Sequence, residues 1–358
     1  MKKIVILMIM MFFSGSILLI PSPLSQQDLY IKAVSEKDPE LKIQLLQQYE
    51  QLYGKTGDKY LKFIYLQLAE TFFQVKNYNE AIQYGEKTLA SGEIAPTNRL
   101  TLFYALANSY YTSQKDLEKA YQYADSMIEL AQWVINKAKN SDLQDLEKEK
   151  LEQFIDTYKK YYIASGYRLQ AKVLFSRIED DVNVIKAAAQ KAVEAYKADK
   201  SENSSRLAFS IAGQLFKKNN LDDAIGIAEN IFDETNPNEQ FAGFLGTLYY
   251  KKGDKDKAVQ YFELAYKASR KIKTAMTIGQ LVYKKDIDKG IQYFADAFIL
   301  SNSDEDSKAY KYLQELYYNK KAKDLAPAKQ DKGFKEIIQA AKVRLGTQEV
   351  TGEAVTTN

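Results

Sequence analysis

Aromatic residues near the ends of helical segments are the side chains best suited to binding chemistry in this chain. Lysines follow three of them directly. Aromatic rings stack on sugar rings or hold apolar side chains of a peptide, and lysines attract carboxylates. The predicted partner-binding set is Phe73, Tyr111, Phe216, Lys217, Tyr250, Lys251, Tyr283 and Lys284.

Both features also have a purely structural interpretation. Successive aromatic residues are ordinary packing residues on helices, and a lysine at a helix C-terminus complements the negative end of the helix dipole. The sequence does not decide between binding and packing, so both interpretations stay open.

Residue types that carry most catalytic chemistry are missing from the 358 residues, which include no histidine and no cysteine. This composition removes imidazole bases, thiolate nucleophiles and thiolate zinc sites. The acidic segments 286–290 and 304–306 lack the full ligand series of a calcium loop, and Gly54-Lys55-Thr56 lacks the strand and first glycine of a phosphate loop. We therefore predict no catalytic residue, no cofactor and no metal site. An enzyme would have to work through carboxylates or tyrosines alone.

The charge balance also limits the partners. Lys and Arg total 50 against 47 Asp and Glu, a net charge of +3. Because this leaves no strong positive field, we expect no nucleic-acid partner.

Pairs of small residues, 11 to 13 positions apart, mark the elements that would position the binding set. An Asn or Asp stands four residues before the second member of each pair. The pairs are Ala69 with Ala81, Ala107 with Ala120, Ala212 with Ala224, Gly246 with Ala258 and Gly279 with Gly290; the predicted helix caps are Asn77, Asp116, Asn220, Asp254 and Asp286. Antiparallel helices approach closely where contact residues are small, and the second helix needs a side-chain oxygen at its start. This pattern predicts an all-α stack of helix hairpins with a period of roughly 34 residues.

The expected organisation follows these units along the chain. Residues 26–200 hold the N-terminal repeats, in which 141–200 are degenerate and best explained by extended helices. Residues 201–345 hold the best-kept repeats and a capping hairpin, and Lys200–Ser205 is a candidate hinge between the two halves. The small and polar residues 346–358 are expected to form a disordered tail.

The first residues, 1–25, have the pattern of an export segment. Lys2 and Lys3 precede an apolar run of 17 residues from Ile4 to Ile20. Such a run would span about 25 Å, at the short end for a membrane-crossing helix. Because no small-x-small pair precedes the cut expected after Ser25, a cleaved signal peptide and an uncleaved anchor through residues 4–20 both stay open.

The hairpin around residues 245–265 resembles the tetratricopeptide repeat family. It reads LGTLYYKKGD from Leu245 to Asp254, followed by Ala258, Tyr261-Phe262 and Ala265. The resemblance implies a right-handed α-solenoid whose concave groove, lined by the first helix of each repeat, holds an extended peptide or a partner helix. It also implies that the five aromatic residues face this groove. Of the basic and amide residues that one subgroup uses to clamp a C-terminal carboxylate, only Asn108 is matched, so we reject that clamp.

These observations lead to one hypothesis and one alternative. The hypothesis is a non-enzymatic exported scaffold that binds a protein or peptide partner along its groove, within an assembly complex of the cell envelope. The alternative is a glycan-recognition subunit that binds envelope polysaccharide through the groove aromatics. Either protein would be periplasmic or extracellular, or anchored in the inner membrane with its repeats outside the cytoplasm.

Overall fold

A computed structural model describes residues 25–56, 58–140, 148–177 and 181–346. Every regular element within these ranges is a helix and none is a strand, which confirms the predicted all-α class. In this described part, no helix is both long enough and apolar enough to cross a membrane. The predicted export segment and the predicted C-terminal tail lie outside the described residues, apart from Ser25 and Gly346 at their borders.

The chain divides into two compact units, Met1–Asp116 and Leu117–Asn358. The candidate hinge at Lys200–Ser205 therefore lies inside the second unit. Glu202–Ser205 form the first turn of the helix Glu202–Lys217 (α10), so only Lys200 and Ser201 of this stretch lie between α10 and the preceding helix, Val182–Ala198 (α9), against which α10 packs.

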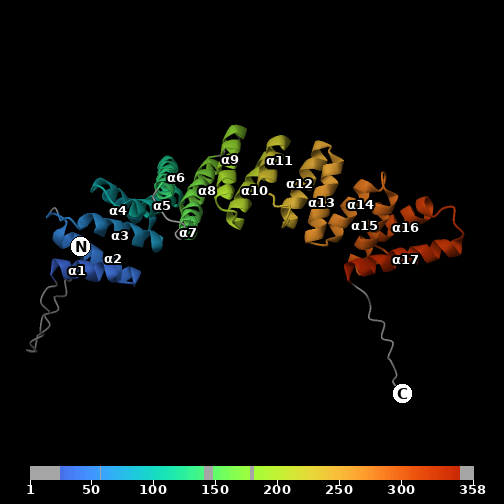
Figure 1. The fold of residues 1–358 in the computed structure, drawn as a ribbon, viewed down its shortest axis with the longest axis horizontal. Coiled ribbons are helices and arrows are strands. Elements are labelled where there is room, and N and C mark those ends of the chain that lie inside the picture. The colour runs from blue at the N-terminus through green and yellow to red at the C-terminus, as the bar shows by residue number, and fades with distance from the viewer. Residues whose placement is uncertain (1–24, 57, 141–147, 178–180, 347–358) are drawn as a thin grey trace, which may run out of the picture. The chain divides into compact units, whose positions relative to one another are not determined.

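The first unit is a stack of helices that pack in chain order (Figure 1). Its helices are α1 (Gln26–Ser35), α2 (Pro39–Tyr53), α3 (Leu61–Gln74), α4 (Tyr78–Ala90) and α5 (Pro96–Thr112). The local sequence explains why α2 begins at Pro39. The Asp38 side chain accepts a bond from the Leu41 N–H, and Pro39 fits the first turn of the helix.

The second unit continues the same pattern over more hairpins (Figure 1). Its first helices are α6 (Leu117–Lys139), α7 (Lys148–Tyr158), the π-helical turn η2 (Lys159–Ile163), α8 (Ala164–Ser176), α9 and α10. They are followed by α11 (Leu221–Asn230), α12 (Glu239–Lys252), α13 (Lys255–Ala268), α14 (Ile272–Val282), α15 (Ile287–Leu300), α16 (Lys308–Leu316), the turn η3 (Tyr317–Lys321) and α17 (Pro327–Leu345).

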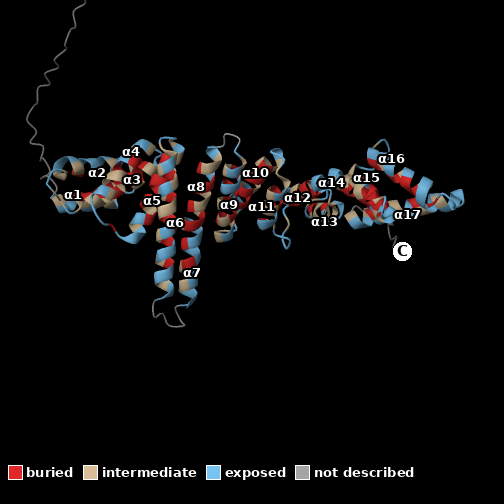
Figure 2. Cartoon of the chain, turned by 90° about the horizontal axis from the view of Figure 1, so that it is seen from above, coloured by how far each residue is buried: buried red, intermediate tan, exposed pale blue. Residues whose placement is uncertain are grey.

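Long helices account for the region where the repeat register is lost. Elements α7, η2 and α8 follow one another without a break, and α6 packs on all three. The ends of α6 and α7 extend past the neighbouring helices of this unit (Figure 2). This agrees with the extended helices expected for residues 141–200.

In four of the five pairs, the small residues lie on two helices that pack against each other as a hairpin, whereas Ala107 and Ala120 belong to different units. The seven alanines are at most 2% exposed: Ala69, Ala81, Ala107, Ala120, Ala212, Ala224 and Ala258. A Cβ atom added at Gly246 or Gly279 would stand 2.8 Å from the Phe262 ring or 2.9 Å from the Phe294 ring. At Gly290 it would stand 2.6 Å from the Tyr283 Cβ. These glycines therefore make room for an aromatic residue of the opposite helix.

The predicted caps behave in two ways. The side chains of Asp254 and Asp286 accept bonds from the N–H groups of Lys257 and Lys289. Asn77 and Asn220 also hold the N-cap position, but their side chains make no capping bond, so the capping role predicted for them is wrong. Residue type alone does not explain the difference, because Asn238, which is also an amide, accepts a bond from the Gln240 N–H at the start of a later helix. Asp116 directly precedes α6.

Tyrosine hydroxyls tie successive hairpins together and explain part of the tyrosine content. Tyr84 donates to Glu50 at 2.8 Å and Tyr110 to Glu86 at 2.6 Å in the first unit. In the second unit, Tyr293 donates to Glu263 at 2.9 Å and Tyr249 donates to Glu229. Burial, together with the bond to the carboxylate, raises the pKa of Tyr84 and of Tyr249 to about 12.

Candidate functional site

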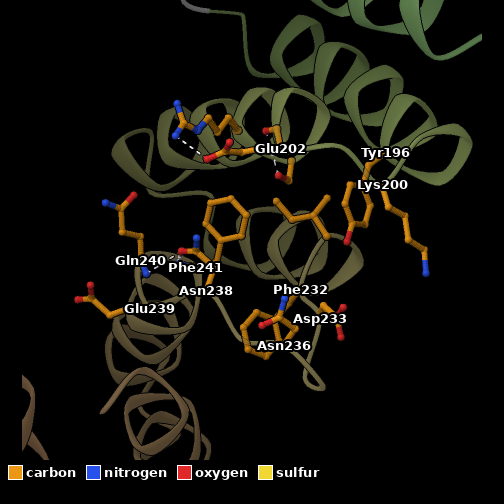
Figure 3. Close-up of a pocket in the computed structure, with 13 residues that line it drawn as sticks. Tyr196, Lys200, Glu202, Phe232, Asp233, Asn236, Asn238, Glu239, Gln240 and Phe241 are labelled. Atoms are coloured by element: carbon orange, nitrogen blue, oxygen red, sulfur yellow. Dashed lines mark hydrogen bonds and ion pairs between the residues drawn. The ribbon is translucent and has the colours of Figure 1, made fainter. Parts of the chain in front are cut away.

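A cavity of about 460 Å³ opens in the second unit between the end of α9, the start of α10 and the loop from α11 to α12. Figure 3 shows the rings of Tyr196, Phe232 and Phe241 around it, with Lys200 and Asp233 at its edge. A cavity of this size accommodates a small ligand or a few residues of a peptide.

Most polar groups of the cavity wall are already held by the protein. Glu202 pairs with Arg206 at 2.5 Å, and the Asn238 side chain accepts a bond from the Gln240 N–H at 2.9 Å. Asp233 accepts bonds from the Thr235 hydroxyl and N–H, and these bonds lower the pKa of its carboxyl group. The cavity therefore presents fixed polar groups beside aromatic rings rather than one dominant charge.

Phe241 connects the cavity to a cluster of phenylalanines on α10 and α12. Its ring stacks on Phe209 with 4.6 Å between centroids. Phe244 then contacts Phe209 at 4.8 Å and Phe216 at 6.0 Å, both edge to face. These rings are half-buried, so they offer apolar surface to solvent as well as packing the fold.

Two glycines of the same helices face open space. A Cβ atom added at Gly213 of α10 or at Gly243 of α12 would meet no atom within 4 Å. Gly213 lies one turn after Phe209, on the same face of α10. We call the surface made by Phe209, Gly213, Phe216, Gly243 and Tyr250 the α10–α12 face.

The predicted binding residues are split between the units, and none of them lines the cavity. In the first unit, Phe73 packs against Tyr104 at 5.7 Å and Tyr111 is half-buried. In the second, Phe216 and Tyr283 pack partly against hydrophobic cores, whereas Tyr250 is 48% exposed. Packing thus accounts for much of the aromatic series, and Tyr250 is the aromatic member most available to a partner.

Lysine doublets directly follow Phe216, Tyr250 and Tyr283, and a fourth doublet, Lys320-Lys321, closes the turn η3. In three of these doublets the second lysine bridges to the preceding hairpin. Lys252 pairs with Asp222 of α11 and Lys285 with Asp256 of α13, each at 2.6 Å. Lys321 of η3 pairs with Asp288 of α15 at 2.5 Å. These ion pairs connect positions 29 to 33 residues apart, so they form only when hairpins stack.

The first lysine of each doublet behaves differently. Lys217, Lys251, Lys284 and Lys320 are exposed and form no ion pair with the residues that the structure describes. Lys284 and Lys320 stand over the Tyr283 ring, with 6.0 and 5.3 Å from Nζ to the ring centroid. The sequence prediction missed Lys320, although the aromatic residues before the doublet Lys320-Lys321 were a usable signal.

Within the described residues, no group of three or more acidic side chains is arranged to hold a metal ion. The expectations of no metal and no cofactor stay predictions.

No protein-family model and no curated protein matches this chain. Solved structures that resemble it include a thermophilic TPR protein of Thermus thermophilus at 14% identity, covering 66% of this chain and 99% of that chain with a TM-score of 0.30. The C-terminal part of a TPR repeat-containing protein from Cytophaga hutchinsonii has 16% identity, covers 79% and 100% of the two chains, and has a TM-score of 0.39. The assembly chaperone of RpL4 has 11% identity, 73% and 96% coverage, and a TM-score of 0.40.

These similarities concern helical repeat architecture alone, because the identities and TM-scores are too low to transfer a site or a partner. The stacked hairpins themselves define the class of protein, an all-α helical-repeat protein. Within that class, the similar structures named above are TPR proteins and an assembly chaperone.

Proposed function

We propose that this chain is a non-enzymatic repeat scaffold that binds an extended segment of a protein partner on the α10–α12 face. The observation that carries the proposal is the open space beside Gly213 and Gly243. A glycine inside a helix costs about 0.5–1 kcal/mol relative to alanine, and beside the phenylalanine rings of α10 and α12 the missing side chains leave room for another molecule to approach closely.

The surroundings of the two glycines support this function. Half-buried rings of Phe209, Phe216 and Phe244 would contact apolar side chains of the partner. The cavity beside Phe241 would take one end of the segment. From Arg206 to Lys217 the helix rises roughly 16 Å, which matches about five residues of an extended chain.

Blocking substitutions at the glycines test this proposal on the full-length chain. Peptides of twelve residues selected from a displayed random library on the wild-type protein should bind Gly213→Leu and Gly243→Leu at least about tenfold more weakly. A Cβ atom added at either glycine meets nothing within 4 Å, so we expect the far-ultraviolet circular dichroism spectrum to stay unchanged. Gly226→Leu on α11 is the matched control, because its added Cβ also meets nothing within 4 Å. Equal binding by all three variants would refute the assignment of the α10–α12 face.

The residues that line the cavity also support the alternative function, binding of a glycan, and this alternative is tested separately. The cavity is lined by the aromatic rings of Tyr196 and Phe232 and by the side-chain amides of Asn236 and Gln240. Aromatic and amide side chains of this kind also bind sugars. Saturable binding of soluble cell-wall fragments, lost in Tyr196→Ala and retained in Gly213→Leu, would support this second function. A titration without saturation would exclude it.

We also propose export, on the basis of residues 1–25 alone. N-terminal sequencing of the mature protein from a fractionated host distinguishes a cleaved signal peptide from an anchor. Recovery of the intact chain in the cytoplasmic fraction would contradict both.

A further inference from the structure

We infer that Lys217, Lys251, Lys284 and Lys320 form a binding row for an acidic, extended peptide segment. This inference rests on the proposed function and specifies the chemistry of the partner. We call these four residues the lysine row.

The division of roles within the doublets is the first argument. Lys252, Lys285 and Lys321 are paired with Asp222, Asp256 and Asp288, so the second lysines already serve to join the hairpins. Lys217, Lys251 and Lys284 form no ion pair of this kind among the described residues, and Lys320 reaches only the Tyr283 ring of the preceding hairpin, at 5.3 Å. A lysine at a helix C-terminus complements the dipole, but the second lysine of each doublet lies at the same helix end.

The neighbours of the lysine row provide the second argument. Phe216, Tyr250 and Tyr283 immediately precede Lys217, Lys251 and Lys284, and Tyr250 is exposed. At Tyr283 the structure places two of these positive charges, Lys284 and Lys320, over one aromatic ring. This combination fits a segment in which carboxylates alternate with apolar or small side chains.

Spacing decides which anionic partner fits best. Lys284 and Lys320 stand 6.0 and 5.3 Å from the centroid of the same Tyr283 ring, so their ammonium groups are at most about 11 Å apart, which equals about three residues of an extended chain at roughly 3.3 Å each. Carboxylates at every third residue would therefore meet successive lysines. A nucleic-acid strand carries a charge about every 3.4 Å, and the net charge of the chain is only +3, so a peptide is the better match.

Two triple variants of the full-length protein separate the lysine row from general positive charge. Lys251→Gln/Lys284→Gln/Lys320→Gln removes three members of the row, and Lys252→Gln/Lys285→Gln/Lys321→Gln removes the same charge from the bridging positions. The probes are fluorescein-labelled (Glu-Gly-Ser)4, an isomer with its four Glu residues adjacent, (Lys-Gly-Ser)4 and the oligonucleotide dT12, titrated by fluorescence anisotropy at two salt concentrations.

We expect (Glu-Gly-Ser)4 to bind the wild type more tightly than its isomer and to bind the row variant at least about tenfold more weakly. The bridging variant should bind within about twofold of the wild type but unfold at a lower temperature. Equal loss in both variants, or no loss in either, would overturn the inference. Tighter binding of dT12 than of the peptide, lost in the row variant, would also overturn it in favour of nucleic acid.

The outcome also separates this inference from the proposed function. If the library-selected peptides lack acidic residues but lose binding in Gly213→Leu, the α10–α12 face is supported as the binding surface and the lysine row is rejected. If peptide binding depends neither on Gly213 nor on the lysine row, the proposed function itself is rejected.

Discussion

Arg344 of α17 donates two bonds to the buried carboxylate of Asp296 on α15, at 3.1 Å from Nε and 2.5 Å from a terminal nitrogen. Tyr266 of α13 donates its hydroxyl to the other oxygen of Asp296 at 3.2 Å. Asp296 is only 3% exposed. Three helices of the C-terminal hairpins therefore meet at one buried negative charge.

Replacing Arg344 with methionine should destabilise the second unit. The change leaves Asp296 buried without its cation, and we expect the free energy of unfolding to fall by about 2 kcal/mol because Arg344 is itself partly exposed. Urea unfolding measures the change. Lys335→Met, at an exposed site on the same helix, is the control and should have little effect. Equal stability of the two variants would show that the pair contributes nothing.

Packed and open glycines should respond to alanine in opposite directions. At Gly246, the new Cβ would meet the Phe262 ring at 2.8 Å, and we expect a loss of about 1–3 kcal/mol from overpacking. At Gly226, where the Cβ meets nothing within 4 Å, helix propensity should add up to about 1 kcal/mol. Thermal unfolding of both variants tests the assignment, and a stabilising Gly246→Ala would contradict it.

The turn between α3 and α4 holds a lysine in a conformation that favours glycine. Lys76 has a φ of 62°, and the N–H of Asn77 donates to the Phe72 carbonyl at 2.8 Å to close the turn. Lys76→Gly should therefore raise the free energy of unfolding by about 1 kcal/mol. Asn219, with a φ of 59°, occupies the same place after α10, and Asn219→Gly should gain less because asparagine tolerates this conformation. Calorimetry on both variants gives the comparison; a larger gain at Asn219 would be inconsistent with this explanation.

Alkaline pH should weaken the fold through its buried tyrosines. The pKa of Tyr84 is raised to about 12 in the folded chain, against about 10 in an unfolded one. The folded state thus keeps a proton that the unfolded state releases, so this stabilisation is complete below pH 10 and is lost as the pH rises from 10 towards 12. Tyr84→Phe should make urea stability fall less steeply over this interval, by up to about 1 kcal/mol per pH unit. An unchanged slope would mean that Tyr84 is not protected; Tyr250→Phe, at an exposed site, is the control.

The sequence predicted the hairpins well because their signals are local. The hairpins have small residues at the helix contact, and some have an acid such as Asp254 at the start of the second helix. In one hairpin, Gly253 with a φ of 92° forms the turn. Each of these signals acts within a few residues. The caps at Asn77 and Asn220 were predicted wrongly, since residue type alone does not show whether an amide oxygen reaches the first N–H groups.

The cavity was not predicted because its walls come from separate segments. Tyr196 lies in the last turn of α9, Phe241 lies in the first turn of α12, and Phe232 lies in the loop between α11 and α12. No spacing rule joins these positions, and the irregular loop that brings them together carries no repeat signal. The sequence instead directed attention to the opposite ends of the first helices, where Tyr250 and Lys251 lie.

The sequence by itself determined that this chain is a series of helix hairpins without the usual catalytic side chains, because helix periodicity, capping and composition are properties of short segments. Only the tertiary structure decided what each repeated residue does. Lys251 and Lys252 are adjacent and identical, yet Lys252 pairs with Asp222 and Lys251 does not, since only stacking brings residues about 30 positions apart together. In the same way, Gly246 is packed and Gly243 is open because the neighbouring helix covers one face of α12 and leaves the other free.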